Sequence, residues 1–271
     1  MRILQFVILA ALAFNTISCQ MTSNDLATDP LNDQLQYSID SVSSQFSCST
    51  DSMPRICASA SAQFITIQTE STVAQNIENG INKEIVNSSN AEVKPESPKE
   101  LVDNFINEYK QLDKEIDTYR MPWETETDLK VMLETPLFFE VSISAYTFTG
   151  GAHGNHFTRY LVFEKEHGLP LSLDSLLIPG TKLEVLKTGE RIFRESENLE
   201  DQSLEDAGFW FPENAFYLPD NYLYTSDGLI FIYNPYDVAA YAKGYIELLI
   251  PYGDAEAWIK QKYRLIPQTE A

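Results

Sequence analysis

The chain has 271 residues, of which 44% are hydrophobic and 22% are charged, and this balance is typical of a folded protein. Its 40 acidic residues outnumber its 19 basic residues, which gives a formal net charge of −21 at pH 7. Such a surface repels nucleic acid, so we exclude DNA and RNA as expected partners. The sequence holds no reaction centre that would name a substrate.

The first residues are typical of an export signal. Residues 3–14 form an apolar stretch that is too short to span a bilayer as a mature helix but suits the core of a signal peptide. Thr16-Ile17-Ser18-Cys19 follows and resembles the lipobox of bacterial lipoproteins, which implies that Cys19 carries the lipid. Thr16 stands where leucine is usual, and an ordinary signal peptide cut near Ser18 is the alternative. We expect residues 1–18 to be removed.

This reading gives an expected location in the bacterial cell envelope, facing the periplasm. The lipid is the expected membrane attachment, because the acidic chain is not attracted to anionic headgroups. Inner-membrane retention signals have an aspartate directly after the lipidated cysteine. This chain has Gln20 there, which favours the outer membrane. Residues 19–36 are polar and rich in turn formers, so we expect a flexible tether there.

Two further cysteines, Cys48 and Cys57, form an even pair. An oxidising periplasm favours a disulfide between them. The alternative, a metal pair, needs further thiol or imidazole ligands, and no histidine precedes His153. We therefore expect a disulfide that fixes a small turn ahead of the first strong strand.

Residues 37–120 predict a strand followed by two helices. Residues 62–69 are rich in β-branched side chains, which favours the strand. An apolar residue then recurs every four positions and predicts the first helix, at Val73, Ile77, Ile81 and Ile85. The second helix is expected to begin at Ser97-Pro98-Lys99-Glu100, which has the signature of a capped helix N-terminus. Its expected inward face is Leu101, Val102, Phe105, Ile106, Tyr109 and Leu112.

After Pro122 the apolar spacing changes from about four to two, which predicts strands. We expect strands over residues 125–133, 137–148, 157–163, 220–224, 229–233 and 245–250, and helices over residues 183–194, 235–242 and 254–263. Turns are expected at residues 134–136, 165–168 and 225–228. The lack of βαβ glycine fingerprints favours an α+β fold with a mostly antiparallel sheet packed with helices. The predicted division is a small N-terminal subdomain (residues 37–120) and a larger C-terminal domain (residues 121–271).

Several stretches resemble the RsiV/PdaC-like domains of bacterial envelope proteins. They are residues 146–155 (YTFTGGAHGN), 168–173 (GLPLSL), 228–239 (GLIFIYNPYDVA), 242–244 (AKG) and 250–252 (IPY). Residues 62–117 resemble the smaller domain that usually precedes them, so the resemblance covers about residues 60–265.

The resemblance implies an extracytoplasmic α+β module without established catalysis of its own. In one relative this module is the lysozyme-sensing ectodomain of an anti-sigma factor, and in another it accompanies a peptidoglycan deacetylase domain. This chain shows no second transmembrane segment, and nothing in it supplies the deacetylase metal site. We therefore expect the envelope module to stand alone.

A glycine-rich turn between two expected strands is the candidate ligand site. The simpler interpretation is a tight or bulged connection whose backbone angles only glycine adopts cheaply. In the functional interpretation, a glycan hydroxyl or a partner's loop approaches the open backbone and bonds to neighbouring side chains. The candidate ligand-binding residues are Tyr146, Gly150, Gly151, His153, Gly154 and Asn155.

The histidines give weak indications of chemistry. His153 and His156 are three residues apart, which places them on opposite faces of an extended segment, so we expect no metal and no other cofactor. A nucleophile that pairs with His153 need not lie near it in sequence, but the sequence contains no nucleophile elbow. His167 lies in an expected turn and is expected to be solvated.

Aromatic residues make up 12% of the chain and cluster over residues 209–211, 216–217 and 222–224, where we expect most of them in the core. If Trp210 and Phe211 are exposed instead, they mark a partner or sugar-stacking surface. The acidic residues 195–206 are expected to form a solvated loop, which could also bind a basic protein such as lysozyme.

The expected function is a noncatalytic lipoprotein that binds or senses a peptidoglycan fragment or an envelope protein. The alternative is a cell-wall hydrolase or esterase that uses His153.

Overall fold

The structure, a computed structural model, describes residues 34–50, 53–88, 94–116, 121–199 and 201–265. The expected signal peptide, Cys19 and nearly all of the expected tether lie outside the described residues. Within the described ranges, none of the helices has the length and apolar character needed to cross a membrane.

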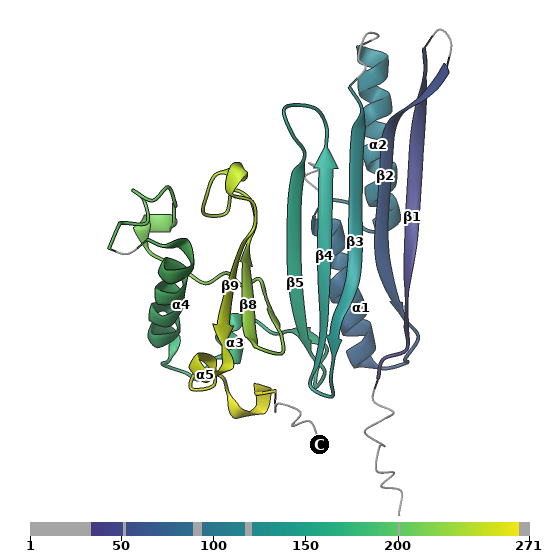
Figure 1. The fold of residues 1–271 in the computed structure, drawn as a ribbon. Coiled ribbons are helices and arrows are strands. Elements are labelled where there is room, and N and C mark those ends of the chain that lie inside the picture. The colour runs from purple at the N-terminus through teal and green to yellow at the C-terminus, as the bar shows by residue number, and fades with distance from the viewer. Residues whose placement is uncertain (1–33, 51–52, 89–93, 117–120, 200, 266–271) are drawn as a thin grey trace, which may run out of the picture. The chain divides into compact units, whose positions relative to one another are not determined.

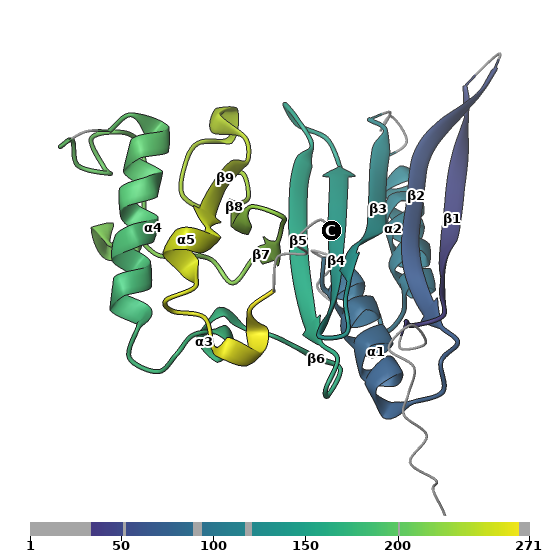
Figure 2. The ribbon, with the colours of Figure 1, turned by 60° about the horizontal axis from the view of Figure 1, so that its bottom comes forward.

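The described chain forms a six-stranded sheet, a three-stranded sheet and helices (Figures 1 and 2). The large sheet contains, in spatial order, β1 (Tyr37–Thr50), β2 (Met53–Ile67), β3 (Trp123–Glu134), β4 (Phe138–Phe148), β5 (Asn155–Glu164) and β6 (Leu169–Pro170). The small sheet contains β7 (Tyr222–Tyr224), β8 (Gly228–Tyr233) and β9 (Ile246–Pro251). The α-helices are α1 (Thr72–Asn87), α2 (Pro98–Glu115), α3 (Leu173–Leu176), α4 (Lys182–Glu197) and α5 (Tyr252–Ala255), and short 3-10 turns are η2 (Pro212–Asn214), η3 (Tyr241–Lys243) and η4 (Gln261–Tyr263).

Strand pairing is antiparallel throughout the described sheets except between β2 and β3, which run parallel. The predicted α+β fold with a mostly antiparallel sheet is confirmed. The predicted domain boundary at residues 120 and 121 falls between β2 and β3, which pair with each other in one sheet. The division into two domains stays a prediction.

Helices α1 and α2 cover one face of the large sheet (Figure 2). The fully buried Ile77, Ile81 and Ile85 of α1 pack with residues of β3, β4 and β5, as their spacing predicts. On α2, Val102, Ile106 and Tyr109 are buried. They lie against three alanines of β2, Ala58, Ala60 and Ala62, whose small side chains let the helix approach closely.

Both helices begin at the serines that their sequence indicates. Ser71 accepts a hydrogen bond from the backbone N–H of Ala74, and Ser97 accepts one from Glu100. The Glu100 carboxylate in turn accepts from the N–H of Glu96, so the expected capping box is present with its second bond shifted by one residue.

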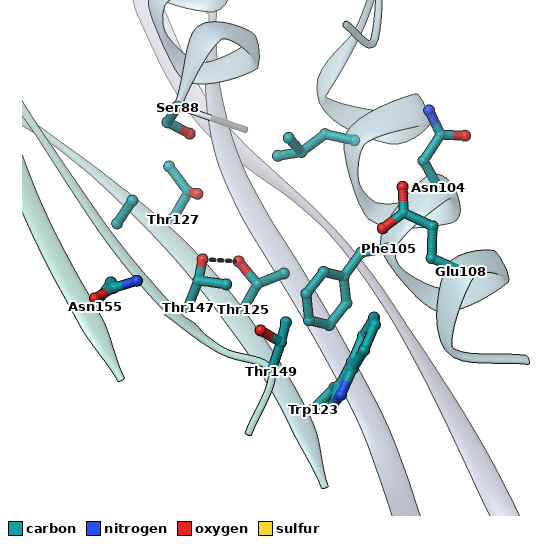
Figure 3. A pocket seen from close by; sticks show the side chains of 12 residues that line it. Ser88, Asn104, Phe105, Glu108, Trp123, Thr125, Thr127, Thr147, Thr149 and Asn155 are labelled. Atoms are coloured by element: carbon teal, nitrogen blue, oxygen red, sulfur yellow. Dashed lines mark hydrogen bonds between the residues drawn. The ribbon is translucent and has the colours of Figure 1, made fainter. Parts of the chain in front are cut away.

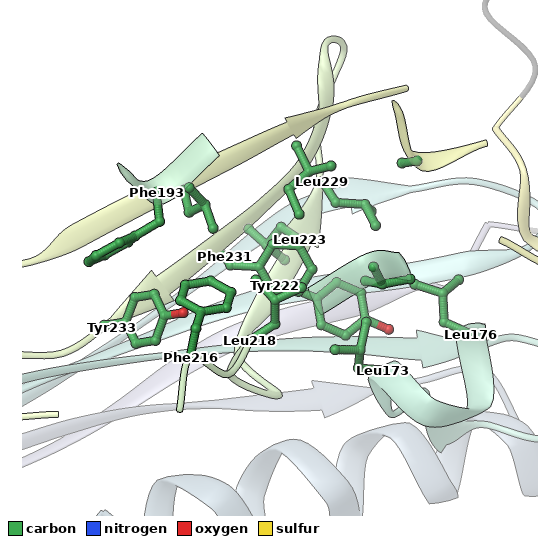
Figure 4. Close-up of a cluster of buried hydrophobic side chains, with 14 of the residues drawn as sticks. Leu173, Leu176, Phe193, Phe216, Leu218, Tyr222, Leu223, Leu229, Phe231 and Tyr233 are labelled. Carbon is green, nitrogen blue, oxygen red and sulfur yellow. The ribbon is translucent and has the colours of Figure 1, made fainter. Parts of the chain in front are cut away.

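A further hydrophobic cluster joins the other face of β4 and β5 to the three-stranded sheet and α4 (Figure 4). Phe193 of α4 is fully buried, and its ring lies 5.0 to 5.6 Å from the rings of Phe209, Phe211 and Phe216. These are residues of the aromatic clusters that the sequence analysis places in the core, and for them the prediction is confirmed.

Two asparagine side chains close the outer edge of β5 along the part where none of the described strands pairs with it. The backbone N–H groups of Thr158 and Tyr160 donate to the side-chain oxygens of Asn234 and Asn221, each at 2.7 Å. The Asn221 amide also donates to the carbonyls of Thr158 and Ile232, at 2.9 and 3.2 Å. Asn221 therefore ties the edge of the large sheet to β8, and an exposed edge that could pair with another chain is avoided.

The expected disulfide joins Cys48 and Cys57, whose Cα atoms are 5.8 Å apart. It links β1 to β2 across their hairpin rather than lying ahead of the first strand. The register shifts between Phe46 and Ser47, so that Phe46 faces Ala58 and Ser47 faces Ile56, which leaves Cys57 as the extra residue of a bulge. Both cysteines are buried beside α2.

Replacing both cysteines with alanine should lower the free energy of unfolding by about 2 to 3 kcal/mol, because the short cross-linked loop then regains its freedom in the unfolded chain. Denaturant unfolding of the double variant and of the oxidised protein measures the difference. The reduced wild-type protein is the control and should match the double variant. Equal stability of all three would contradict the prediction.

The structure corrects two expected helices. Over residues 235–242 Tyr236 has a φ of 75°, which a helix cannot accommodate, and the Val238 carbonyl accepts from the N–H of Trp210. Over residues 254–263 only α5 and η4 form. The intervening backbone pairs instead with residues at and just after the end of α3, since Ile178 donates to the carbonyl of Trp258, and Lys260 to that of Leu176.

The acidic residues 195–206 differ in part from the expected loop. Glu195 and Glu197 belong to the last turn of α4, which ends at Asn198 in the left-handed conformation. Leu199 and Leu204 are buried and anchor the segment that follows, whereas the side chains of Glu205 and Asp206 are exposed, as expected.

Candidate functional site

The glycine-rich turn connects β4 to β5. Gly150 and Gly151 have φ angles of 110° and 102°, which residues with a side chain rarely adopt. Gly154 is needed for a different reason, because a Cβ atom there would lie 2.2 Å from the ring of Tyr146. The interpretation as a tight connection is thus confirmed, and ligand binding by this turn stays a prediction.

His153 lies exposed at the end of this turn beside two tyrosines. Its ring stacks on that of Tyr241, with centroids 3.7 Å apart and planes inclined by 12°. Its Nδ1 lies 3.1 Å from the Gly154 carbonyl, and its Nε2 lies 3.5 Å from the hydroxyl of Tyr236. The structure therefore surrounds His153 with aromatic rings and a backbone carbonyl, and among the described residues its hydrogen-bonding contacts include no serine or cysteine.

The second histidine of the turn lies elsewhere. His156 pairs across the strands with Tyr146, and their ring centroids are 4.8 Å apart. Across the described ranges, no group of three or more histidine, cysteine, aspartate or glutamate side chains could hold a metal ion. His167 is exposed in the turn before β6, as expected.

A cleft of about 290 Å³ opens on the helix side of the large sheet, between α2 and the strands β3 and β4 (Figure 3). We call it the α2 cleft. Its lining combines two aromatic rings, hydroxyl groups, amides and one carboxylate. The lining residues are Ser88, Leu101, Asn104, Phe105, Glu108, Trp123, Thr125, Thr127, Ala145, Thr147, Thr149 and Asn155.

The α2 cleft exists because the inward face of the sheet changes from apolar to polar along its strands. Alternate residues of a strand share a face, so Thr125 and Thr127 continue the row that leads to the buried Leu129. On β4, Thr147 likewise continues the row of Ile143. Threonine hydroxyls thus take positions where the core would otherwise place aliphatic side chains, and they face α2.

The polar and aromatic groups of the α2 cleft are ordered by contacts with one another. The hydroxyls of Thr125 and Thr147 lie 2.9 Å apart, and that of Thr125 also bonds to the Tyr146 carbonyl at 3.1 Å. The ring centroids of Phe105 and Trp123 lie 5.6 Å apart. Figure 3 shows the two rings next to each other at one end of the cleft. These side chains offer one small ligand a flat apolar surface together with both hydrogen-bond donors and acceptors.

Of the candidate ligand residues from the sequence, Asn155 is the one that lines the α2 cleft. Tyr146 lies on the strand position next to Thr147 and so on the opposite face of the sheet. The sequence analysis missed Phe105 and Trp123 as site residues, and it noted Thr125 and Thr127 only as part of a strand pattern. The sequence signal that could have indicated this cleft was the presence of threonines at strand positions that share a face with buried apolar residues.

The aromatic run at residues 209–211 divides between core and surface. Phe209 and Phe211 are each 3% exposed, whereas Trp210 is 48% exposed. The sequence analysis made a partner surface conditional on exposure of these two rings. Trp210 is exposed and meets this condition, whereas Phe211 is buried and does not.

Two family models match the chain. Residues 59–156 match "Deacetylase PdaC", and residues 174–253 match "Protein of unknown function (DUF3298)". The resemblance that the sequence indicates is confirmed, and the matches indicate a cell-envelope-related domain of unknown function. Every residue that lines the α2 cleft falls within residues 59–156, which we call the PdaC segment after the model that they match. Residues 174–253 are called the DUF3298 segment in the same way.

Two solved structures share the fold. A DUF3298 family member from Bacteroides fragilis is 21% identical with a TM-score of 0.63, and the match covers 84% of this chain and 94% of that one. A DUF3298 family protein from Pseudomonas aeruginosa is 17% identical with a TM-score of 0.64, and the match covers 86% and 97% of the two chains. A comparison with curated proteins gives no match.

Proposed function

Because the chain carries a PdaC segment followed by a DUF3298 segment, we propose that it is a noncatalytic lipoprotein that binds the sugar backbone of the bacterial cell wall. The proposed anchor is an acylated Cys19, exposed when residues 1–18 are removed, and the proposed location is the periplasmic side of the outer membrane. The acyl chains provide the attachment, since the chain's net charge of −21 repels anionic lipid headgroups.

The α2 cleft is the observation on which the binding function rests. A sugar ring has apolar C–H groups on its faces and hydroxyl or acetamido groups around its rim. Phe105 and Trp123 offer the flat apolar contact, and the threonines, Asn104 and Asn155 offer donors and acceptors for the rim. The volume of about 290 Å³ lies near the lower end of small-ligand pockets, which suits a single sugar unit.

The charge of the α2 cleft supports an uncharged or cationic ligand rather than a polyanion. Glu108 is the one charged side chain among its twelve lining residues, and it is acidic. N-acetylated amino sugars, which carry no charge on their rings, fit this environment and occur in the cell-wall backbone.

Full-length protein should bind the tetramer of N-acetylglucosamine, and Phe105→Leu should weaken that binding about tenfold. The substitution removes the aromatic face, a contact of about 0.5 to 1.5 kcal/mol, and keeps an apolar side chain at this position of α2. Isothermal titration calorimetry measures both affinities.

Phe46→Leu is the matched control, because the Phe46 ring packs on Tyr109 in the same aromatic cluster without lining the α2 cleft, and its affinity should equal that of the wild type. Absence of binding heat with the tetramer would rule out the proposed function. Salt-sensitive binding of lysozyme in its place would indicate a basic envelope protein as the partner.

A further inference from the structure

A second cleft, of about 380 Å³, adjoins the first. Its lining comes from the C-terminal end of α1, the start of β5 and the segment after β8. We call it the tyrosine cleft. Its lining residues are Asn87, Ser88, Asn155, His156, Phe157, Pro235, Tyr236 and Tyr241. Ser88 and Asn155 also line the α2 cleft, so the two clefts meet at these residues.

The two tyrosines are held in place by contacts that leave their rings available. Tyr241 donates its hydroxyl to the Gly154 carbonyl at 2.9 Å and stacks on His153, while Tyr236 lies 5.5 Å from Tyr241 between ring centroids. Tyr236 is 53% exposed. Its φ of 75° is unusual for a bulky residue and costs conformational energy, so the surrounding contacts hold an exposed ring in a strained position.

We infer that the α2 cleft and the tyrosine cleft form one groove that binds a chain of several N-acetylated amino sugars, with consecutive units in the two clefts. This inference rests on the proposed function and adds the length of the ligand. Each cleft alone is close to the smallest volume that holds a small ligand, whereas their shared residues allow one continuous chain to occupy both.

The lining chemistry of the tyrosine cleft repeats that of the α2 cleft. Aromatic rings, Tyr236 and Tyr241 here and Phe105 and Trp123 there, combine with amide and hydroxyl groups in both. The tyrosine cleft contains no carboxylate, lysine or arginine side chain among its eight lining residues. A polymer of similar, uncharged units therefore meets similar surroundings along the groove.

The glycine-rich turn acquires a defined place in this arrangement. It brings His153 against the back of Tyr241 and leads into Asn155, at which the two clefts meet. The matched PdaC segment ends at residue 156, and Tyr236 and Tyr241 belong to the DUF3298 segment, so the inferred groove crosses from one segment to the other.

The test compares N-acetylglucosamine with its oligomers of two and four units by calorimetry on the full-length protein. Affinity should rise about tenfold or more from the monomer to the dimer, because a second subsite adds contacts without a second association cost. Tyr236→Leu should abolish this gain while leaving the monomer affinity within about twofold of the wild type. Phe105→Leu should weaken binding at every length.

Tyr245→Leu is the control, since Tyr245 is 40% exposed and lines neither cleft, and it should keep the full gain. The wild-type length series needs no variant and decides the question by itself. Equal affinities for monomer and dimer, or a full gain in Tyr236→Leu, would overturn the continuous groove and leave the proposed function standing. Absence of binding at every length would overturn both.

Discussion

Replacing Glu140 with glutamine should stabilise the protein by about 3 kcal/mol at pH 7. Glu140 lies on β4, where its side chain is completely buried. Burial raises the pKa of its carboxyl from 4.5 to about 8, and the backbone of Tyr224 offsets part of that rise. The folded protein therefore holds a proton at pH 7 that the unfolded chain releases, and this difference costs stability.

The surroundings of Glu140 explain why its carboxyl has no compensating partner. Neither oxygen has a hydrogen-bond partner among the described residues that meets ordinary geometry. The neighbouring tyrosines, Tyr222, Tyr224 and Tyr252, donate their hydroxyls to the backbone carbonyls of Leu171, Tyr263 and Thr225 instead. An ionised carboxylate would add an unpaired buried charge to this aromatic layer.

The effect has a defined pH dependence. Because the folded pKa lies above the unfolded one, the stability contributed by protonated Glu140 is complete below pH 4.5 and is lost as the pH rises towards 8. The stability difference between Glu140→Gln and wild type should therefore be small at pH 4.5, grow with a slope of about 1.4 kcal/mol per pH unit, and level off above pH 8.

Urea unfolding of both proteins between pH 4.5 and 9 measures this difference. Glu126→Gln is the matched control, because Glu126 is an exposed strand glutamate, and it should change stability by less than about 0.5 kcal/mol. A difference between Glu140→Gln and wild type that does not vary with pH would contradict the assignment.

Asn221→Ala should destabilise the fold by about 3 kcal/mol. The side chain is 5% exposed and makes three hydrogen bonds to backbone groups of β5 and β8. Its loss leaves the N–H of Tyr160 and the carbonyls of Thr158 and Ile232 without these bonds, and each unsatisfied buried group costs about 1 to 3 kcal/mol before water relieves part of it.

Asn234→Ala provides the graded comparison, because Asn234 makes one such bond to β5, to the N–H of Thr158, and is only half-buried. We expect it to cost about 1 kcal/mol. Thermal or urea unfolding measures the stability of both variants. Equal stability of Asn221→Ala and Asn234→Ala would contradict the role of Asn221 in closing the edge of β5.

The sequence predicts those elements whose own residues carry a period or a cap. Helices α1 and α2 follow from the isoleucine spacing and from Ser97, and the hairpin of β7 and β8 from its Asp-Gly turn. Strand β1 was missed, since it is rich in serine and its apolar Ile39 is exposed. Its backbone pairs along its whole length with β2, so pairing rather than side-chain pattern determines the strand.

The candidate site was predictable only in part, for the same reason. Local sequence shows that the glycines of residues 150–154 form a turn, but not which face the neighbouring side chains occupy. The groove requires α2, β3, β5 and the segment after β8 to meet, and this depends on tertiary packing. The two expected helices that failed are also cases in which long-range backbone bonds replace local ones.

The parallel pairing of β2 with β3 determines the order in which the large sheet can assemble. The hairpins of β1 with β2 and of β3 with β4 each close through short turns, whereas Ala58 reaches Trp123 only after the intervening chain has folded back as α1 and α2. Closing so long a loop costs entropy before its contacts form, so we expect the two halves of the sheet to join late in folding. The α2 cleft lies between α2, which packs on β2, and the strands β3 and β4, so we expect a binding-competent protein only after that junction has formed.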